Sequence, residues 1–473
     1  MPVLRDIPPD LRDPGARAPV LIVGAGACGL SAALTLADAG IECVVLERDA
    51  LPSGSTALSS GFIPACGTRF QAEIGVADSL DLFVADILHK NRHQANPRMV
   101  RAVCAASGPA LEWLADRHGI PFHVIDGFLY PGHSVPRMHA VPEKTGRGLI
   151  DRLSRAAELA GIAVVNEARV NALYVEAGSD AVRGVRILRP DGSTEDIGCD
   201  ALILACNGFG GNPEMVRHYM PEIAQAEYAG HAGNQGDAVQ WGVELGAILS
   251  DMGAYQGHGS WATPHGQLVT WALMMDGGIQ VNANGERFWN EHQGYSEASQ
   301  QVIAQPGGVA WDIYDARLDA LGASFPDYVE LKRVGAIRHA PTAHQLAALL
   351  GIDGDGLAAT LDACAQFRSG ARPCPFGRDF TRAPALEAPY FAVKVTGALF
   401  HTQGGLEVDD GARVLRQDGA PFPNLYAGGG AARGVSGSAV WGYLSGNGLL
   451  TAITLGRLAA QSAVDALRER AGG

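Results

Sequence analysis

The chain lacks the features of several large classes of protein. Basic residues are few, since 36 Lys and Arg stand against 50 Asp and Glu and the net charge is −14. No run of Lys and Arg offers a local exception, so the composition argues against a nucleic-acid partner. No apolar stretch reaches the roughly 18 residues that a membrane span needs. The N-terminal segment has prolines, mixed charges and no apolar core, which is unlike a signal peptide.

The eight cysteines also lack the spacing of a metal site or a haem site. The sequence contains no CxxC pair, no zinc-type spacing and no CxxCH motif. Such scattered cysteines are typical of reduced, mostly buried thiols. Together with the absence of a targeting segment, they predict a soluble cytoplasmic protein.

Apolar residues and glycine are plentiful. The hydrophobic content is 47% and the chain has 61 glycines among 473 residues. A chain of this length can form two domains, or one large domain with an insertion. Many tight loops near a ligand would account for the glycines.

The most informative segment lies near the N-terminus. The apolar run Val20–Val23 leads directly into Gly24-x-Gly26-x-x-Gly29, an alanine-rich helical stretch follows, and a second apolar run ends at Glu47. In this arrangement the first glycine allows a tight turn, the second lets a pyrophosphate approach the backbone, and the third lets the helix pack on the sheet. The helix N-terminus attracts phosphate, and the acid accepts hydrogen bonds from ribose hydroxyls. The segment therefore predicts a dinucleotide site.

Periodicity gives a coarse outline of the remaining chain. Residues 79–118 predict two helices, the second ending at Gly119. A hairpin is expected between residues 182–188 and 194–198, and residues 201–205 read as a buried parallel strand. A long helix is expected from about Gly448.

The pattern becomes mixed in the middle of the chain and turns strand-like again near its C-terminal part. We therefore expect a sheet domain made from residues 1–235 and 389–473, with residues 236–388 inserted as a cap. The predicted fold class is α/β, with a Rossmann-like domain and an inserted α+β capping domain.

Several glycine- and polar-rich blocks are spread along nearly the whole chain: GxGxxG with Glu47, Gly132–Arg137, Gly208–Asn212, Gly236-Asp237, Asn284–Glu291, His401–Gly405, Asn424–Gly428 and Gly446–Leu449. In this order they resemble one family, the fumarate reductase/succinate dehydrogenase flavoproteins, which include the 3-ketosteroid dehydrogenases. The resemblance implies FAD bound in a glutathione-reductase-type domain, with the cap closing over the isoalloxazine ring.

The resemblance also implies which residues contact the cofactor. No histidine occurs between Leu51 and Gly67, so we expect FAD to be bound without a covalent histidyl link. The N–H groups that open the last helix would stabilise negative charge on the flavin ring. The implied residues are Gly24, Gly26, Ala27, Cys28, Gly29, Glu47, Arg48, Ser55, Ser60, Gly61, Val170, Ala205, Asn207, Gly208, Gly236, Asp237, Gly429, Gly430, Gly446, Asn447, Gly448 and Leu449.

Two departures from the fumarate reductases concern the substrate. Those enzymes have an arginine that protonates the substrate and a second one that binds its carboxylate. By block position, Tyr295 and Tyr443 stand in these two places. A dicarboxylate would lose its charged partners, so fumarate or succinate turnover is not expected.

Tyrosines at these positions are similar to those of the ketosteroid dehydrogenases, and the spacing Tyr443-x-Ser445 resembles the Δ4-type enzymes. Desaturation of a ketone requires loss of an α-proton while enolate charge grows on oxygen, followed by loss of hydride from the β-carbon. One phenol can hydrogen-bond the oxygen and a second, if its pKa is lowered, can act as base. Ser445 or the N–H groups of Gly446 and Gly448 would supply a second donor. The alternative is that both tyrosines only line a packed pocket.

Two histidines complicate a purely steroid interpretation. His401 and His258 match positions where the reductases bind a substrate carboxylate. Their presence leaves room for a smaller ketone with a polar or carboxylate group, such as a substituted cyclohexanone. The HTxGG context favours a functional role for His401, and the alternative for each histidine is a core residue with its hydrogen bonds satisfied.

We thus predict an FAD-dependent ketone desaturase. The alternatives are a flavin-dependent ene-reductase acting on a non-dicarboxylate enoate or enone, and a flavin-loaded binding module without turnover. The sequence has no second nucleotide fingerprint, haem motif or iron–sulfur ligands. Electrons would therefore pass to an external acceptor, either a quinone, a carrier protein or oxygen.

Overall fold

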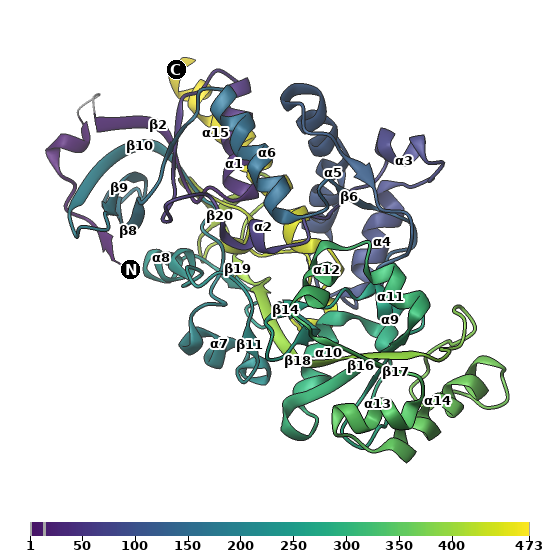
Figure 1. The fold of residues 1–473 in the computed structure, drawn as a ribbon. Helices are drawn as coiled ribbons and strands as arrows, with labels where there is room; N and C mark the ends of the chain where they lie inside the picture. Colours follow the sequence, from purple (N-terminus) through teal and green to yellow (C-terminus); the bar gives the residue numbers. More distant parts are fainter. Residues whose placement is uncertain (1, 13–15, 473) are drawn as a thin grey trace.

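A computed structural model describes residues 2–12 and 16–472 of the chain; positions 1, 13–15 and 473, which the predicted sheet domain includes, lie outside the described residues. Two mixed sheets occupy separate halves of the molecule (Figure 1). Segments from both ends of the chain form one half, and the middle of the chain forms most of the other. This arrangement confirms the predicted α/β class with an FAD-binding-type domain.

Within the described residues, nine strands form the first sheet. Its central strands pair in parallel because helices cross between them, whereas its outer part is an antiparallel hairpin. The strands are β1 (Val3–Leu4), β8 (Arg169–Val175), β9 (Val182–Leu188), β10 (Thr194–Leu204), β2 (Arg17–Val23), β3 (Cys43–Leu46) and β7 (Ala163–Val165), with β21 (Pro421–Ala427) and β20 (Arg413–Leu415) beside β10.

One strand of this sheet joins two elements that the sequence presents separately. Residues 194–198 pair antiparallel with β9, as predicted for the hairpin, and residues 201–204 pair in parallel with β2, as predicted for a buried strand. Both belong to the single strand β10. Thr194 and Glu195 are exposed, Asp196 is half-buried and the apolar residues at 201–204 are buried, which explains why the two halves have different patterns.

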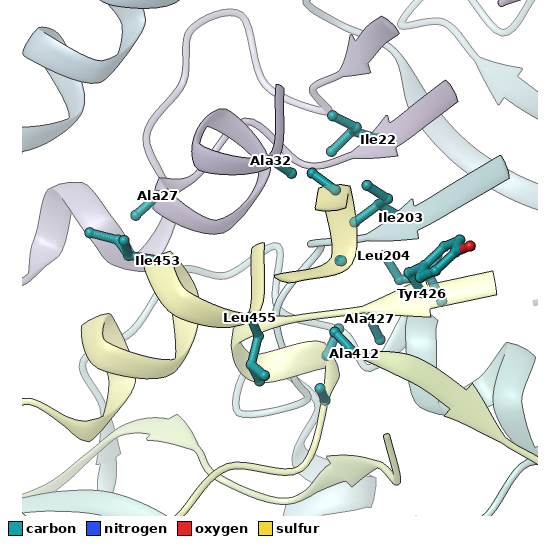
Figure 2. Packing of buried hydrophobic residues seen from close by; sticks show 14 of the residues in the cluster. Ile22, Ala27, Ala32, Ile203, Leu204, Ala412, Tyr426, Ala427, Ile453 and Leu455 are labelled. Atoms are coloured by element: carbon teal, nitrogen blue, oxygen red, sulfur yellow. The ribbon is translucent and has the colours of Figure 1, made fainter. Parts of the chain in front are cut away.

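Two helices pack against the same region of the sheet. Helix α1 (Ala27–Asp38) follows β2, and helix α15 (Asn447–Gly472) crosses it closely, because a side chain at Gly456 would meet the Cys28 carbonyl oxygen at 2.3 Å. Figure 2 shows the buried aliphatic side chains between these helices and strands β2, β10 and β21. This contact brings the N-termini of the two helices to the same side of the sheet.

The helices expected from periodicity are present. Residues 79–118 form α4 (Leu80–Lys90) and α5 (Pro97–His118), and Gly119 ends the second in a left-handed conformation with φ 65°. The predicted long last helix is α15. The remaining helices on this half are α2 (Gly54–Leu58), α3 (Arg69–Glu73), α6 (Gly146–Leu159), α7 (Pro213–Tyr219) and α8 (Asp237–Leu245).

The second sheet has seven strands in the described chain, and its central strand comes from outside the middle segment. Strand β18 (Tyr390–Thr402) pairs with four neighbours in this sheet. The other strands are β14 (Gln267–Leu268), β13 (Tyr255–Ala262), β16 (Val309–Asp315), β15 (Ile279–Val281), β11 (Glu227–Tyr228) and β17 (Ile337–Ala340).

The pairing of β18 bears on the expected domain limits of 236 and 388. A boundary at 389 would assign β18 to the first half, although it pairs with strands of the second sheet alone. We propose that the cap runs to Thr402 and begins after α8, because α8 contacts β1 of the first sheet although it follows residue 236. The cap helices are α9 (Ala272–Met275), α10 (Tyr295–Ile303), α11 (Ala316–Gly322), α12 (Pro326–Arg333), α13 (Ala343–Leu350) and α14 (Gly354–Arg368).

Two small sheets lie elsewhere, β4–β6–β5 (Ile63–Pro64, Met138–Ala140 and His123–Val124) and β12–β19 (Leu249–Ser250 and Gly405–Leu406). Across residues 2–12 and 16–472, none of the helices has the length and apolar character needed to cross a bilayer. All eight cysteines lie in the described chain and are free thiols.

Candidate active site

One large cavity lies where the two sheets approach each other, and both halves contribute to its wall. It holds about 1880 Å³ of space between atoms, part of which is open to solvent. The cavity wall runs from Gly24 and Glu47 to Tyr295 and Tyr443, so one cavity joins the predicted nucleotide residues to the predicted catalytic residues. We call the part around Gly24, Gly26 and Glu47 the nucleotide end, and the part around Tyr295 and Tyr443 the substrate end.

Glycines shape the nucleotide end. A side chain added at Gly29 would lie 1.9 Å from the Gly24 carbonyl oxygen, so Gly29 is needed for the close packing of α1 on β2. A Cβ at Gly26 would have only Thr56 Oγ1 near it, at 3.4 Å, and would otherwise fill the cavity. The space beside Gly26 is thus kept free for a ligand at the N-terminus of α1.

Glu47 lies at the end of β3 and is 7% exposed. Its carboxylate accepts hydrogen bonds from the backbone N–H groups of Ala25, at 2.8 Å, and Asp49, at 3.0 Å. Burial raises the pKa of Glu47, and these two hydrogen bonds oppose that rise. Each oxygen keeps a further lone pair, which suits the hydroxyls of a ribose.

Polar residues beyond Glu47 extend the nucleotide end. Arg48 donates to the Gly233 carbonyl oxygen and lies 3.8 Å from the Asp237 carboxylate. Asn207, whose φ is 65°, donates from Nδ2 to Ser55 Oγ at 2.7 Å. These contacts join the loops after β3, β10 and β11 around one space.

Most of the cofactor residues expected from the resemblance line this cavity. They are Gly24, Gly26, Ala27, Cys28, Glu47, Arg48, Ser55, Ser60, Gly61, Val170, Ala205, Asn207, Asp237, Gly429, Gly430, Gly446, Gly448 and Leu449.

Four expected residues do not line the cavity among the described residues: Gly29, Gly208, Gly236 and Asn447. The glycines allow close packing or a turn, since a Cβ at Gly208 would meet Thr402 Oγ1 at 1.9 Å and Gly236 has φ 80°. Asn447 is fully buried, and its Oδ1 has no hydrogen-bond partner in the described chain. Their contribution to cofactor binding stays a prediction.

Some residues of the cavity wall were not predicted from the sequence. Thr56 Oγ1 accepts a hydrogen bond from the Ala27 N–H at 3.0 Å, so it lies directly at the N-terminus of α1. Arg169, His231 and Asn234 also line the cavity. Ser55, Ser60 and Gly61 near it were predicted, but nothing in the sequence distinguishes Thr56 from its neighbours.

The substrate end is lined by aromatic side chains. Tyr295 begins helix α10 of the cap, and its ring centroid lies 6.1 Å from that of Tyr443, which precedes α15. His258 of β13 stacks on Tyr295 at 4.8 Å, and His401 of β18 meets Tyr443 edge-on at 5.7 Å. The five residues predicted to be catalytic, Ser445 included, therefore surround one space.

The two phenols share a hydroxyl cluster with Ser445. The Tyr295 hydroxyl interacts with those of Tyr443 and Ser445, and the Tyr443 oxygen interacts with the N–H groups of Gly446 and Gly448. Burial raises the pKa of Tyr295 to about 12 and that of Tyr443 further above its ordinary value. Both phenols are therefore protonated at neutral pH.

Both histidines are neutral because burial lowers their pKa values, to about 3 for His258 and about 4 for His401. His258 Nδ1 accepts from the Ser260 N–H at 3.0 Å, which leaves the proton on Nε2. A chain of hydrogen bonds runs from Asn447 through Ser436 and Gln403 to His401 Nδ1. Neutral imidazoles act as hydrogen-bond donors rather than as cations.

The comparison with protein families decides which family this fold belongs to. A model of the FAD binding domain matches residues 19–449, which include the nucleotide end, the whole cap and the start of α15. The chain belongs to this FAD-binding family.

Relatives within the FAD-binding family act on different substrates. NADH:fumarate oxidoreductase of Klebsiella pneumoniae is 29% identical over 95% of the chain, which spans 48% of that protein. Urocanate reductase of Eggerthella lenta is 30% identical over 87% of the chain and 69% of its own length. 4-Oxocyclohexanecarboxylate 2-dehydrogenase of Sinomonas cyclohexanicum is 23% identical over 87% of both chains.

Solved structures of the family agree with the fold. A flavocytochrome c3 fumarate reductase in its open conformation superposes with a TM-score of 0.80, at 27% identity, over 96% of this chain and 79% of that one. The 3-ketosteroid Δ4-(5α)-dehydrogenase of Rhodococcus jostii RHA1 in complex with 4-androstene-3,17-dione has a TM-score of 0.75, at 25% identity, over 95% and 97%. Membership of this family of FAD-dependent oxidoreductases confirms FAD as the cofactor.

The nucleotide end of the cavity fits FAD. The free space beside Gly26, the helix N-terminus and the buried Glu47 carboxylate suit a pyrophosphate and a ribose. The N-terminus of α15 lies at the boundary of the two ends, where Gly448 approaches His401 so closely that a Cβ would lie 2.7 Å from its Nε2. We propose that the residues of this end hold the cofactor and that the substrate end faces its redox-active ring.

Proposed function

We propose that the protein introduces a C=C bond α,β to the carbonyl of a cyclic ketone, a 3-ketosteroid or a smaller cyclic ketone such as a substituted cyclohexanone. The observation that supports this is the facing pair of phenols, Tyr295 and Tyr443, in an end of the cavity that has no Lys or Arg among its described wall residues. The two cations in the cavity wall, Arg48 and Arg169, belong to the nucleotide end.

Tyr443 is suited to bind the ketone oxygen. The N–H groups of Gly446 and Gly448, at the N-terminus of α15, lower the pKa of Tyr443 against the rise that burial causes, which strengthens its O–H group as a donor. A donor aimed at an oxygen that gains charge lowers the barrier by roughly 3 kcal/mol. Ser445 and the Nε2–H of His258 are further donors in the same space.

Tyr295 is suited to accept the α-proton. It begins helix α10 of the cap and faces Tyr443 across the substrate end, and the hydroxyls of Tyr443 and Ser445 favour its anion by lowering its pKa against the rise that burial causes. Burial raises the pKa of Tyr295, so its phenol is protonated at neutral pH. The lowered pKa expected of a phenol base is therefore not found. Once the Tyr295 hydroxyl has released its own proton to solvent, the phenolate oxygen takes the substrate α-proton as the β-hydrogen leaves with its electron pair. Bound FAD supplies the hydride acceptor.

A second candidate is the reverse reaction on an enone or enoate that is not a dicarboxylate. The neutral imidazoles of His258 and His401, both in the wall, favour polar groups on such a substrate, and two of the relatives are reductases by name. The same groups would then work in the opposite direction, with Tyr295 as the acid.

Flavin bleaching under anaerobic conditions tests both candidates. The holoenzyme is mixed with 4-androstene-3,17-dione and its saturated analogue, with cyclohexanones and with succinate, and flavin absorbance is followed. We expect saturated ketones to bleach the flavin and succinate to leave it oxidised, because the substrate end has no cation for a carboxylate. Rapid bleaching by succinate, or rapid reoxidation of reduced enzyme by fumarate, would contradict the proposal. Reoxidation by an enone faster than reduction by its ketone would favour the reductase.

The electrons must then leave the protein. We propose an external acceptor, a quinone, a carrier protein or oxygen, and reoxidation rates of the bleached enzyme with each would distinguish them.

A further inference from the structure

The rim of the substrate end carries a charged side chain that the proposed reaction does not use. Asp327 belongs to α12 and lines the cavity together with Phe325. Among the described residues, no hydrogen bond or ion pair is formed by its carboxylate, and burial raises its pKa. A half-buried carboxylate without a partner costs free energy unless a ligand supplies one.

The position of α12 explains how Asp327 reaches the cavity. Helix α12 packs against β14, whose residue Leu268 also lines the wall. Aromatic rings connect this rim with the catalytic phenols: Tyr295 and Tyr130 lie 6.5 Å apart, Tyr130 and Phe128 4.8 Å, and Phe128 and Phe325 5.7 Å. The electrostatic effects of both Tyr295 and Asp327 act on the Tyr130 phenol. Asp327 therefore shares one space with the catalytic groups.

A role in helix stability does not account for Asp327. It lies in the first turn of α12, where an acid complements the helix dipole. However, the helix has no side-chain cap, and no backbone hydrogen bond stabilises the Asp327 carboxylate. The side chain faces the cavity instead of the N–H groups of its own helix.

Among the described wall residues, the substrate end has a carboxylate but no Lys or Arg. Arg48 and Arg169 are the cations of the described wall and lie at the nucleotide end, whereas Asp327 has no counter-charge near it. The Asp327 carboxylate would repel a substrate that has a carboxylate remote from its ketone. A substrate with a hydroxyl or an ammonium at that place would donate a hydrogen bond to Asp327.

We propose that Asp327 determines specificity: it binds a hydrogen-bond donor, a hydroxyl or an ammonium, at the end of the substrate remote from the ketone, and it excludes carboxylates. This inference rests on the proposed function and narrows it. It implies that this protein does not use the substrate of the Sinomonas relative, which is a carboxylate by name.

Three ketones of equal ring size test the inference: cyclohexanone, 4-hydroxycyclohexanone and 4-oxocyclohexanecarboxylate. Stopped-flow reduction of the flavin at a series of ketone concentrations gives an apparent Kd and a limiting rate for each. For the wild-type holoenzyme we expect the hydroxyketone to bind about tenfold more tightly than cyclohexanone and the carboxylate at least about tenfold more weakly.

The variants are Asp327→Ala and Asp327→Asn, with Glu330→Gln as the matched control. Glu330 lies on the same helix, pairs with Arg333 and does not line the cavity, so its variant removes one charge from α12 without changing the wall. Asp327→Ala should abolish the preference for the hydroxyketone, and both Asp327 variants should bind the carboxylate about tenfold more tightly than the wild type, at similar limiting rates. Glu330→Gln should keep the wild-type order.

The outcomes separate the two proposals. If cyclohexanone bleaches the flavin and the order of the three ketones is the same in all variants, Asp327 does not determine specificity, while the proposed reaction stands. If no ketone bleaches the wild-type flavin, the proposed reaction fails. Calorimetric titration of the same ketones then tests Asp327 alone, and equal affinities for wild type and Asp327→Ala would overturn its role.

Discussion

The two ends of the cavity are made from different parts of the polypeptide. At the nucleotide end, glycines, backbone N–H groups and a few polar side chains such as Glu47 form the wall, and residues between Val23 and Gly61 supply much of it. At the substrate end, large side chains form the wall, and they come from segments as distant as Tyr130, His258, Tyr295, His401 and Tyr443. The nucleotide end thus presents backbone groups to the pyrophosphate, which all dinucleotides share. The substrate end presents side chains to the substrate, which differs between members of the family.

This difference implies that a substitution at one end should not impair binding at the other end. A substitution at the nucleotide end should remove the cofactor and leave the phenol pair intact. A substitution at the substrate end should leave the cofactor bound and change the rate or the affinity for substrate. Four predictions test this separation.

The largest effect is expected from Gly26→Val. A Cβ at this position meets little protein, since its one near neighbour is Thr56 Oγ1 at 3.4 Å, so the valine would occupy ligand space. We expect a folded protein purified without FAD, measured by the visible spectrum and by circular dichroism. Gly127→Ala is the control, because a Cβ there has no neighbour within 4 Å. Full flavin content in Gly26→Val would show that the pyrophosphate does not lie beside this residue.

Tyr295→Phe should act at the other end. Removing the proton acceptor should slow flavin reduction by a ketone by about 10²-fold or more, with little change in the apparent Kd. FAD content should equal that of the wild type. In contrast, Tyr443→Phe should weaken ketone binding as well as slow reduction, because it removes a donor to the ketone oxygen. If Tyr295→Phe reduces its flavin at the wild-type rate, the base is another residue, and Tyr443 and His401 are next in line.

The pH dependence sharpens the assignment of the base. The pKa of Tyr295 is raised to about 12, so its ionised fraction grows about tenfold per pH unit below that value. The rate of flavin reduction should therefore rise with pH between about pH 7 and about pH 10 and approach a plateau only above this range. Tyr295→Phe should show no such rise. A rate independent of pH in the wild type would mean that proton loss from Tyr295 does not limit the reaction.

A smaller effect is expected from Lys90→Met. Lys90 of α4 donates to the Gln293 carbonyl oxygen at 2.8 Å and pairs with Glu297, so it holds the chain on both sides of Tyr295. Loss of this anchor should lower the limiting rate of flavin reduction by about three- to tenfold without loss of FAD, because misplacing a catalytic group by a fraction of an ångström slows the reaction. Lys90→Arg should restore most of the rate. Equal rates for all three proteins would show that Tyr295 is oriented by the cap alone.

Much of the fold could be predicted because its signals are local. The hairpin at residues 182–198, the two helices within 79–118 and the last helix were all predicted from the periodicity of adjacent residues, and the structure confirms them. The central place of β18 in the second sheet could not be predicted. Its pairing depends on strands up to about 170 residues away, and its sequence resembles any other buried strand.

The residues of the site could likewise be predicted where their signal is local in the sequence. Glu47 and the glycines were predicted from spacing alone, and they line the cavity or pack beside it. The phenol pair was predicted only through the family resemblance, since no spacing relates Tyr295 to Tyr443. Asp327 and Thr56 were missed, because an aspartate after a proline and a threonine in a serine-rich loop have ordinary explanations. Only the folded chain shows that both face the cavity.

The position of β18 has a practical consequence for building hybrid proteins. Relatives in this family differ in the substrates that their names give, and exchange of the cap is an obvious way to transfer a specificity. A graft of residues 236–388 would leave the recipient's β18 to pair with three foreign strands, β13, β16 and β17, and would keep the recipient's His401 beside a donor's Tyr295. A graft that extends through Thr402 would move β18, these three strands and the histidine together, and would leave only the short strand β11 of the second sheet to the recipient.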